Sequence, residues 1–178
     1  MSEYILLEKP RKRTGREFVK YRRVAPTKPL EVIEMDIKYV WIYGTRKYAY
    51  ILTVIDTFTR YVLHWAVGYT MKSEQVKAVW EYVITKHLQP AGILEQGLDI
   101  EVRNDNGKQF CSELIMNFMK ENYLNQVFTH PYTPEENGHV ESFHKTLGNA
   151  LSKDRFTSLD MLEQRLKKFY TSYNNERS

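Results

Sequence analysis

The sequence predicts an α/β protein built on one mixed sheet of five strands, three antiparallel and then two parallel, flanked by helices. Three stretches with the two-residue period of β-strands follow one another between residues 32 and 69. After residue 73 the period becomes helical and alternates with two short apolar runs. A chain with this order of elements buries its apolar surface by laying helices on a mixed sheet.

The first three strands are expected at 32–42, 47–56 and 61–69. Side chains alternate along a strand, so Asp36 lies on the face opposite a row of apolar residues. Gly44 marks the first turn, and Asp56 before the second turn is interpreted as a turn-capping or Arg60-pairing residue rather than a metal ligand. Aromatic residues of these strands are expected to build the core and cross-strand pairs rather than a platform for nucleic-acid bases; they are Tyr39, Trp41, Tyr48, Tyr50 and Trp65.

The helical part begins with Ser73 as a predicted N-cap, and this first helix is expected to end between His87 and Pro90. A short buried strand over 98–103 then places Asp105 at its carboxyl end, where the carboxylate points into a crevice. The remaining elements are expected as helices at 112–123, 135–152 and 158–174 and a fifth strand at 125–129.

Length and composition predict one domain over residues 31–178, because 178 residues with 42% hydrophobic content can bury one sizeable core. No stretch reaches the roughly 18 to 20 apolar residues that span a bilayer, and the amino terminus lacks a signal-peptide layout. The single Cys111 cannot form an internal disulfide. We therefore expect an intracellular, cytoplasmic and nucleoid-associated protein without a membrane partner.

Residues 1–30 predict a basic arm or linker, partly extended, because they carry nine Lys or Arg against three Glu. Such an arm on a near-neutral body is typical of proteins that bind a polyanion, since neutralising phosphates releases counterions. We assign DNA binding to the basic run Arg11, Lys12 and Arg13. The alternative is a solvated linker without a partner.

Three acidic residues, Asp36, Asp105 and Glu141, form the strongest candidate site, with 35 residues between the last two. Three carboxylates of this kind suit one or two hard divalent cations and so predict phosphodiester chemistry. Each also has a simpler interpretation, as a polar strand position, a turn carboxylate or a solvated helix residue. The five His show no zinc-type spacing, and zinc is not expected.

The segment from His130 to Leu147 predicts a helix onset, with Thr133 and Glu136 as a possible capping box. Asn137, Glu141 and Lys145 are spaced to share one helix face, with His144 nearby, and would line a DNA groove. Gly138 within the first turn implies either a mobile loop tip or close approach of a backbone.

Three features follow one another along the chain: Asp36, the run N-D-N-G-K-Q-F around Asp105, and the run P-Y-T-P-E-E-N-G-H-V-E-S, which ends just after Glu141. Together they resemble the catalytic core of retroviral integrases and insertion-sequence transposases. The similarity extends to the second strand, I-L-T-V-I-D-T-F-T-R, and to the ending Y-N-N-E-R. It covers roughly residues 30–178. Each motif alone is weak, whereas their order and spacing are specific to the DDE superfamily.

This resemblance implies a ribonuclease H-like fold in which Asp36, Asp105 and Glu141 hold two Mg²⁺ or Mn²⁺ ions. It implies DNA strand nicking followed by strand transfer from transposon ends to target DNA, by a homodimer or larger homo-oligomer. DNA contacts are carried over to Tyr132, Asn137 and Lys145. Two rival functions stay open: a ribonuclease H-like nuclease that does not join strands, and a noncatalytic DNA-binding fragment of a transposase.

The sequence departs from the superfamily at Asn104, where transposases commonly have Ser, at Ser142, where many have Arg, and at Gly148, where integrases offer a second Lys. These differences concern DNA contacts rather than the carboxylates. Family members also usually carry a separate DNA-binding domain upstream of the core, so we expect this chain to be a core fragment or one product of a longer element.

Overall fold

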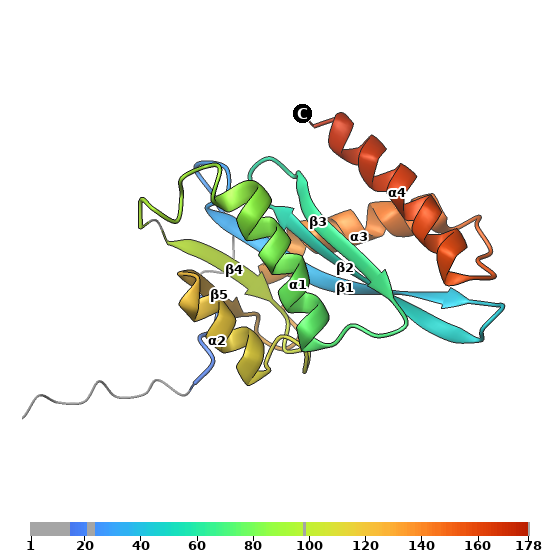
Figure 1. Ribbon diagram of the computed structural model, residues 1–178, viewed down its shortest axis with the longest axis horizontal. Coiled ribbons are helices and arrows are strands. Elements are labelled where there is room, and N and C mark those ends of the chain that lie inside the picture. Colours follow the sequence, from blue (N-terminus) through green and yellow to red (C-terminus); the bar gives the residue numbers. More distant parts are fainter. Residues whose placement is uncertain (1–14, 21–23, 98, 178) are drawn as a thin grey trace, which may run out of the picture.

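The computed structural model describes residues 15–20, 24–97 and 99–177 and shows one sheet between two layers of helices (Figure 1). The strands are β1 (Val32–Ile42), β2 (Lys47–Asp56), β3 (Val62–Gly68), β4 (Ile100–Asn104) and β5 (Leu124–Phe128). Their order across the sheet is β3-β2-β1-β4-β5. β1, β2 and β3 pair antiparallel, whereas β4 and β5 run parallel to β1, as the sequence predicted.

The helices also follow the predicted order. They are α1 (Ser73–Val83) with its π-helical continuation η1 (Ile84–Leu88), α2 (Glu113–Glu121), the 3-10 helix η2 (Pro134–Asn137), α3 (Gly138–Leu151) and α4 (Leu159–Asn175). The N-cap of α1 is Lys72 rather than Ser73, because the Ser73 hydroxyl instead donates to the Gln109 carbonyl oxygen at 3.2 Å. In the described part of the chain, no helix combines the length and the apolar character that crossing a membrane demands.

Two apolar cores lie on the two faces of the sheet. Ile33 and Met35 of β1 point to the core under α1 and α2, while Ile51 and Ile55 of β2 point to the core under α3 and α4. Figure 1 shows α1 in front of the sheet and α3 behind it. Since each large apolar side chain buried in this way contributes about 1.5–3 kcal/mol, the central strand β1 is held firmly from both sides.

The β1–β2 hairpin extends past the rest of the sheet (Figure 1). β4 pairs with β1 only along its first residues, from Val32 to Glu34, whereas β1 and β2 pair along their whole length. The tip of the hairpin rests on the loop between α3 and α4, where the Tyr43 amide donates to the Phe156 carbonyl oxygen at 2.8 Å. The free half of the hairpin is therefore anchored at its tip.

The aromatic residues of this hairpin correct one expectation from the sequence. Trp65 stacks on Tyr170 with 4.7 Å between ring centroids and contributes to the core, as predicted. Tyr39, Trp41 and Tyr48 are exposed instead, because α1 and α2, which cover their face of the sheet, do not reach over the projecting half of the hairpin; on the other face, Ile42 and Ala49 are buried in the core under α3 and α4. Cross-strand ring contacts do form among them.

The Asp56 carboxylate caps the turn between β2 and β3, as expected. It accepts the amide of Thr59 at 3.1 Å and also the amide of Leu30 at 3.0 Å, so it ties the start of β1 to this turn. Because its oxygens accept hydrogen bonds from backbone amides, the Asp56 carboxylate has a structural role.

Residues 15–20, part of the expected basic arm, lie along the edge strand β5. The Val19 amide donates to the Phe128 carbonyl oxygen at 3.0 Å, and the Phe128 amide donates to the Glu17 carbonyl oxygen at 2.8 Å. The Val19 side chain is buried. This stretch therefore lies on a sheet edge, held by backbone hydrogen bonds and one buried side chain. The run Arg11, Lys12 and Arg13 lies outside the described residues.

Candidate active site

All three acidic residues singled out from the sequence line one pocket of about 460 Å³. Asp36 lies midway along β1, Asp105 directly follows β4, and Glu141 lies in the first turn of α3. β1 and β4 run parallel with Glu34 opposite Arg103, so Asp36 and Asp105, each two residues further on, come to the same place on the sheet. The other lining residues are Asn106, Gly107, Asn137 and the segment Thr129–Pro134.

A buried polar chain leads from Asp36 into the core. His144 Nδ1 lies 3.3 Å from Asp36 Oδ2, and His144 Nε2 lies 3.3 Å from Thr53 Oγ1. The Thr53 hydroxyl in turn bonds the Tyr170 hydroxyl at 2.7 Å. Burial raises the pKa of Tyr170 far above its usual value, so this phenol stays protonated. The side chain of Asp36 is thus oriented by contacts that reach α4.

Asp105 and Glu141 both feel the charge of Asp36. Burial raises the pKa of Asp105, and the charge of Asp36 raises it further, while the Gly107 amide that donates to Asp105 Oδ1 at 2.9 Å opposes the shift. Burial likewise raises the pKa of Glu141, again with a contribution from Asp36. Asp36 thus raises the pKa of both other carboxyl groups, and a bound cation would neutralise the negative charge of this pocket.

The donor set fits a hard divalent cation chemically. Besides the carboxylates, the pocket is lined by Asn137, whose Oδ1 is buried and lacks a hydrogen-bond partner among the described residues. Its Nδ2 donates to the Met35 carbonyl oxygen at 3.3 Å, which fixes the orientation of the amide. Oxygen donors of this kind are those that Mg²⁺ and Mn²⁺ prefer. Within the described ranges, no three acidic, His or Cys side chains are close enough to hold an ion without moving.

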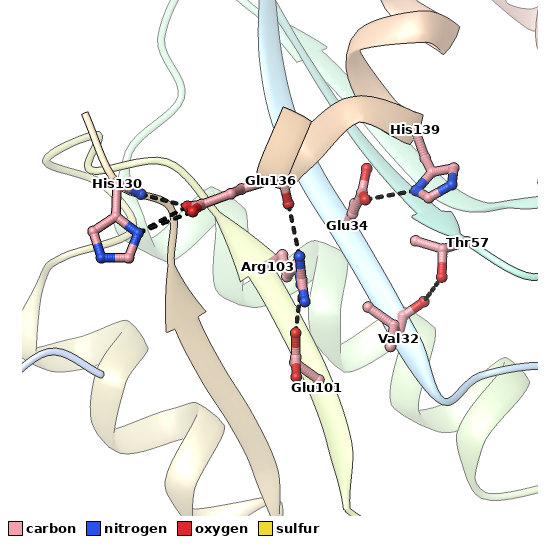
Figure 2. A network of polar contacts seen from close by, with 8 residues as sticks. All are labelled: Val32, Glu34, Thr57, Glu101, Arg103, His130, Glu136 and His139. Carbon is pink, nitrogen blue, oxygen red and sulfur yellow. Dashed lines mark hydrogen bonds and ion pairs between the residues drawn. The ribbon is translucent and has the colours of Figure 1, made fainter. Parts of the chain in front are cut away.

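Two buried side chains hold the loop before α3: Glu136 bonds His130 within the loop, and Arg103 ties the loop to β4 (Figure 2). The Glu136 carboxylate accepts the His130 amide at 2.7 Å and contacts His130 Nδ1 at 3.0 Å. Arg103 lies between this loop and Glu101: its NH1 donates to the Glu136 carbonyl oxygen at 3.2 Å, and its Nε bonds the Glu101 carboxylate. The predicted capping box of Thr133 and Glu136 is therefore wrong, because the Glu136 side chain is used by His130.

Glu34 of β1 holds the first turn of α3. Its fully buried carboxylate accepts the Val140 amide at 2.7 Å and contacts His139 Nδ1 at 2.8 Å (Figure 2). The N-cap residue Asn137 makes no capping bond with its own side chain, so Glu34 supplies the acceptor that a helix start requires. Burial raises the pKa of Glu34 to about 7. Glu141 follows Val140 directly, so its place relative to β1 depends on this contact.

The other residues expected at the helix onset differ from the sequence-based prediction in two respects. Gly138 has a right-handed helical φ of −65°, and a Cβ there would meet open space, so close approach of a backbone does not explain it. Asn137 belongs to η2 rather than to the face of α3 that carries Glu141 and Lys145. His144 was expected only near that face, and its contact with Asp36 could not be foreseen because Thr53 and Tyr170 hold it from other elements.

The candidate DNA-contact residues occupy different places around the pocket. Tyr132 is fully exposed at its rim, Asn137 is buried in its wall, and Lys145 is exposed on α3 outside the lining. Arg16 was not foreseen: its NH1 donates to Asn106 Oδ1 at 3.0 Å, next to Asp105. The signal for Arg16 was the positive charge of the arm, which alone could not single out one residue.

A family model described as an integrase core domain matches residues 26–134, and a second model with the same description matches residues 122–178. The chain belongs to the integrase core domain family. This family consists of polynucleotidyl transferases that act in DNA transposition or integration. The departures at Asn104, Ser142 and Gly148 leave this membership intact.

Relatives of this integrase core domain come from viruses and from bacterial insertion elements. The Gag-Pro-Pol polyprotein of Simian retrovirus SRV-2 is 28% identical over 120 residues, which are 67% of this chain and 6% of that polyprotein. The uncharacterized 39.2 kDa protein of insertion element IS476 from Xanthomonas euvesicatoria is 26% identical over 155 residues, which are 86% of this chain and 42% of that protein. The chain thus spans less than half the length of either relative.

Solved structures share the fold of this integrase core domain. The Mos1 transposase catalytic domain, solved with raltegravir and Mg, has a TM-score of 0.66 at 13% identity and covers 80% of this chain and 71% of its own. The HTLV-2 integrase catalytic core domain in complex with magnesium, in a trimeric form, has a TM-score of 0.51 at 21% identity and covers 72% and 74%. Such cores have the ribonuclease H-like fold, and the fold predicted from the sequence is confirmed.

Proposed function

We propose that this chain is the catalytic core of a DDE-type transposase or integrase that nicks DNA and then transfers the cut strand. The observation that carries the proposal is the single pocket lined by Asp36, Asp105 and Glu141. Family membership supports the class of chemistry, and the effect of the Asp36 charge on the pKa values of Asp105 and Glu141 supports a cationic partner.

Asp36, Asp105 and Glu141 would hold Mg²⁺ or Mn²⁺, two ions when DNA is bound, which polarise the phosphodiester and activate the attacking hydroxyl. Two neighbours of similar fold were solved with Mg, which agrees with this choice of metal. His144 orients the Asp36 carboxylate, and the Gly107 amide orients that of Asp105. Because Glu34 of β1 accepts the Val140 amide, the first turn of α3 is held against β1 and Glu141 stays at the pocket of the other two acids.

The partners in this proposal are transposon ends and target DNA, handled by a homodimer or larger homo-oligomer. Tyr132 at the rim and Lys145 on α3 would contact the DNA end, with Arg16 beside Asn106 as an additional cation. The trimeric form of the HTLV-2 core domain supports assembly of several copies. Arg11, Lys12 and Arg13 would add contacts to phosphates without reading sequence.

The test is a nicking and joining assay on a labelled DNA end with Mn²⁺, comparing the natural chain with Asp105→Asn. The variant should lose nicking by at least about a thousandfold, since metal and carboxylate act together, while its DNA retention stays near that of the natural chain. Asp99→Asn is the matched control, because Asp99 is exposed and does not line this pocket.

Four outcomes of this assay separate the proposal from its rivals. Joined products support the transferase, whereas nicks without joining favour a ribonuclease H-like nuclease. Equal nicking by Asp105→Asn contradicts the catalytic assignment. DNA retention without any divalent-metal dependence favours a noncatalytic DNA-binding fragment.

A further inference from the structure

Lys38 brings a positive charge to the face of the sheet that carries the candidate active site. It follows Asp36 by two residues on β1, so both side chains lie on the same face. The next residues of this face, Val40 and Ile42, pack in the core under α3 and α4. Lys38 itself is only partly buried, so its ammonium can meet a ligand from solvent.

The helix α3 runs beside this face of β1 in the same direction. Positions 34, 36 and 38 of the strand contact positions 140, 144 and 148 of the helix in turn. The three contacts are the bond from the Val140 amide to Glu34 at 2.7 Å, the approach of His144 Nδ1 to Asp36 Oδ2 at 3.3 Å, and the approach of Lys38 Nζ to Gly148. Two strand residues advance about 6.7 Å and four helix residues about 6 Å, so the two elements stay in step. Lys38 is therefore placed by the same packing that places Asp36.

Gly148 leaves room for the end of the Lys38 side chain. A Cβ on residue 148 would lie 3.2 Å from Lys38 Nζ and 3.4 Å from Lys38 Cε. Outside the backbone of α3, no other atom of the described residues lies within 4 Å of that point. The space of a side chain at position 148 is thus taken by the Lys38 ammonium, and a larger residue there would displace it.

The charge of Lys38 is not used by the fold to pair an acid. Among residues 15–20, 24–97 and 99–177, no carboxylate lies within ion-pair distance of its ammonium, and Asp36 is paired with His144 instead. A lysine ammonium carries three donors and binds phosphate oxygens as a point charge. Lys38 therefore offers a phosphate-binding group on the Asp36 side of the sheet.

We propose that Lys38 binds a backbone phosphate of the DNA strand whose phosphodiester lies at Asp36, Asp105 and Glu141, and that Gly148 keeps the space for this ammonium. The inference rests on the proposed function, which brings a DNA strand to the pocket. Residues 36 and 38 are about 6.7 Å apart along β1, and one DNA strand rises about 3.4 Å per nucleotide. The bound phosphate therefore lies within about two nucleotides of the cut.

A purely structural role for Lys38 makes a different prediction. The last turn of α3 contains no basic residue, and a cation near the carboxyl end of a helix interacts favourably with its dipole. A lysine that served only this purpose would stabilise the chain and leave DNA binding unchanged. DNA binding and urea unfolding are therefore measured on the same variants.

The experiment measures the affinity for a labelled DNA end by fluorescence anisotropy between about 50 and 200 mM NaCl. Ca²⁺ replaces Mn²⁺ to fill the carboxylate site, and the DNA is recovered afterwards to verify that it is uncut. Lys38→Met keeps the length of the side chain but not its charge. It should bind about tenfold more weakly at the lowest salt, and the slope of log affinity against log salt should fall by about 1. Lys38→Arg keeps the charge and should retain most of the slope.

A second variant tests the position of the ammonium without altering Lys38. Gly148→Leu introduces a better helix former that meets only the Lys38 side chain, so its stability should be no lower than that of the natural chain. Because the ammonium is pushed aside, DNA should bind at least about threefold more weakly. Lys86→Met is the matched control, because Lys86 is exposed on η1, which packs on the opposite face of the sheet. Its affinity and salt slope should equal those of the natural chain.

Several results would overturn the inference. They are an unchanged affinity and salt slope of Lys38→Met, an equal loss of DNA binding by Lys86→Met, and unchanged DNA binding by Gly148→Leu. Lower stability of Lys38→Met with unchanged DNA binding would assign the residue to the fold alone. No binding of the DNA end by the natural chain would contradict both proposals. A reduced slope for Lys38→Met in a chain that does not nick DNA with Mn²⁺ would uphold the phosphate contact and contradict only the proposed function.

Discussion

Glu34 shows how one buried side chain links strand, helix and candidate site. Its carboxylate sits two residues before Asp36 on β1 and receives the amide of Val140, next to Glu141. An ionised carboxylate at a helix start interacts favourably with the helix dipole, yet complete burial favours the neutral form. Burial prevails here, since the pKa of Glu34 rises from 4.5 to about 7.

We predict that Glu34→Gln flattens the pH dependence of stability. As pH rises from 4.5 to 7, the unfolded chain loses the Glu34 proton before the folded chain does, so folding stability falls by at most about 3 kcal/mol from this residue. Gln does not titrate and still accepts the Val140 amide. Urea unfolding at pH 5 and pH 8 should therefore show the variant gaining stability relative to the natural chain, whereas parallel curves would contradict this assignment.

For single residues, the sequence predicted the acidic residues of the candidate site but not the side chains that support them. Asp36, Asp105 and Glu141 stand out because carboxylates in a recognisable order suggest metal chemistry. Glu34 and His144 do not stand out, since their partners come from elements about one hundred residues away. The periodicity of a sequence predicts which face of an element a side chain lies on, but it does not predict which backbone amide of another element the side chain will bond.

The β1–β2 hairpin and the loop after α3 illustrate coupling between elements. Gly44 sits in the turn of the hairpin, where a Cβ would overlap the carbonyl oxygen of Thr157. Backbone atoms cannot turn away as a flexible side chain does. The hairpin therefore keeps its docked position only with Gly at this site.

We predict that Gly44→Ala lowers the free energy of unfolding by about 2–3 kcal/mol, the cost of forcing an extra carbon into a packed contact. Gly138→Ala is the matched control: it adds the same atom into open space at the start of α3 and should raise stability by about 0.5–1 kcal/mol. Urea unfolding of both variants gives the comparison. Equal stability of Gly44→Ala and the natural chain would show that the tip does not dock on Thr157.

The helices and strands were predictable because their apolar residues recur with a clear period. The residues at which they end, and the parts of the sheet that the helices cover, were not predictable. Helix starts differ from the prediction where side chains bond partners outside the helix, as Glu136 does with His130. The exposure of Tyr39 and Tyr48 was not predicted, because a strand covered by helices and a strand in a projecting hairpin have the same alternating sequence pattern. The structure shows that β4 pairs with β1 only from Val32 to Glu34, so the later part of β1 projects beyond β4.

For the whole molecule, the order of strands explains why three acids far apart in the chain share a pocket. Placing β4 beside β1 in parallel brings Asp105 next to Asp36, and the return of the chain from β5 into α3 brings Glu141 over them. The resemblance to integrases and transposases predicted this topology. The distances between the carboxylates, by contrast, were not predictable from any sequence pattern.

The most direct test of this account is a crystal of the chain with a DNA end soaked in Mn²⁺, using anomalous scattering to locate the ion. We predict Mn²⁺ bound by oxygens of Asp36 and Asp105, at about 2.2 Å, with Glu141 drawn toward them. The same soak of Asp105→Asn should show the site weakened or empty. Manganese found elsewhere, with the three carboxylates of the natural chain still apart, would contradict the proposal that they form one catalytic centre.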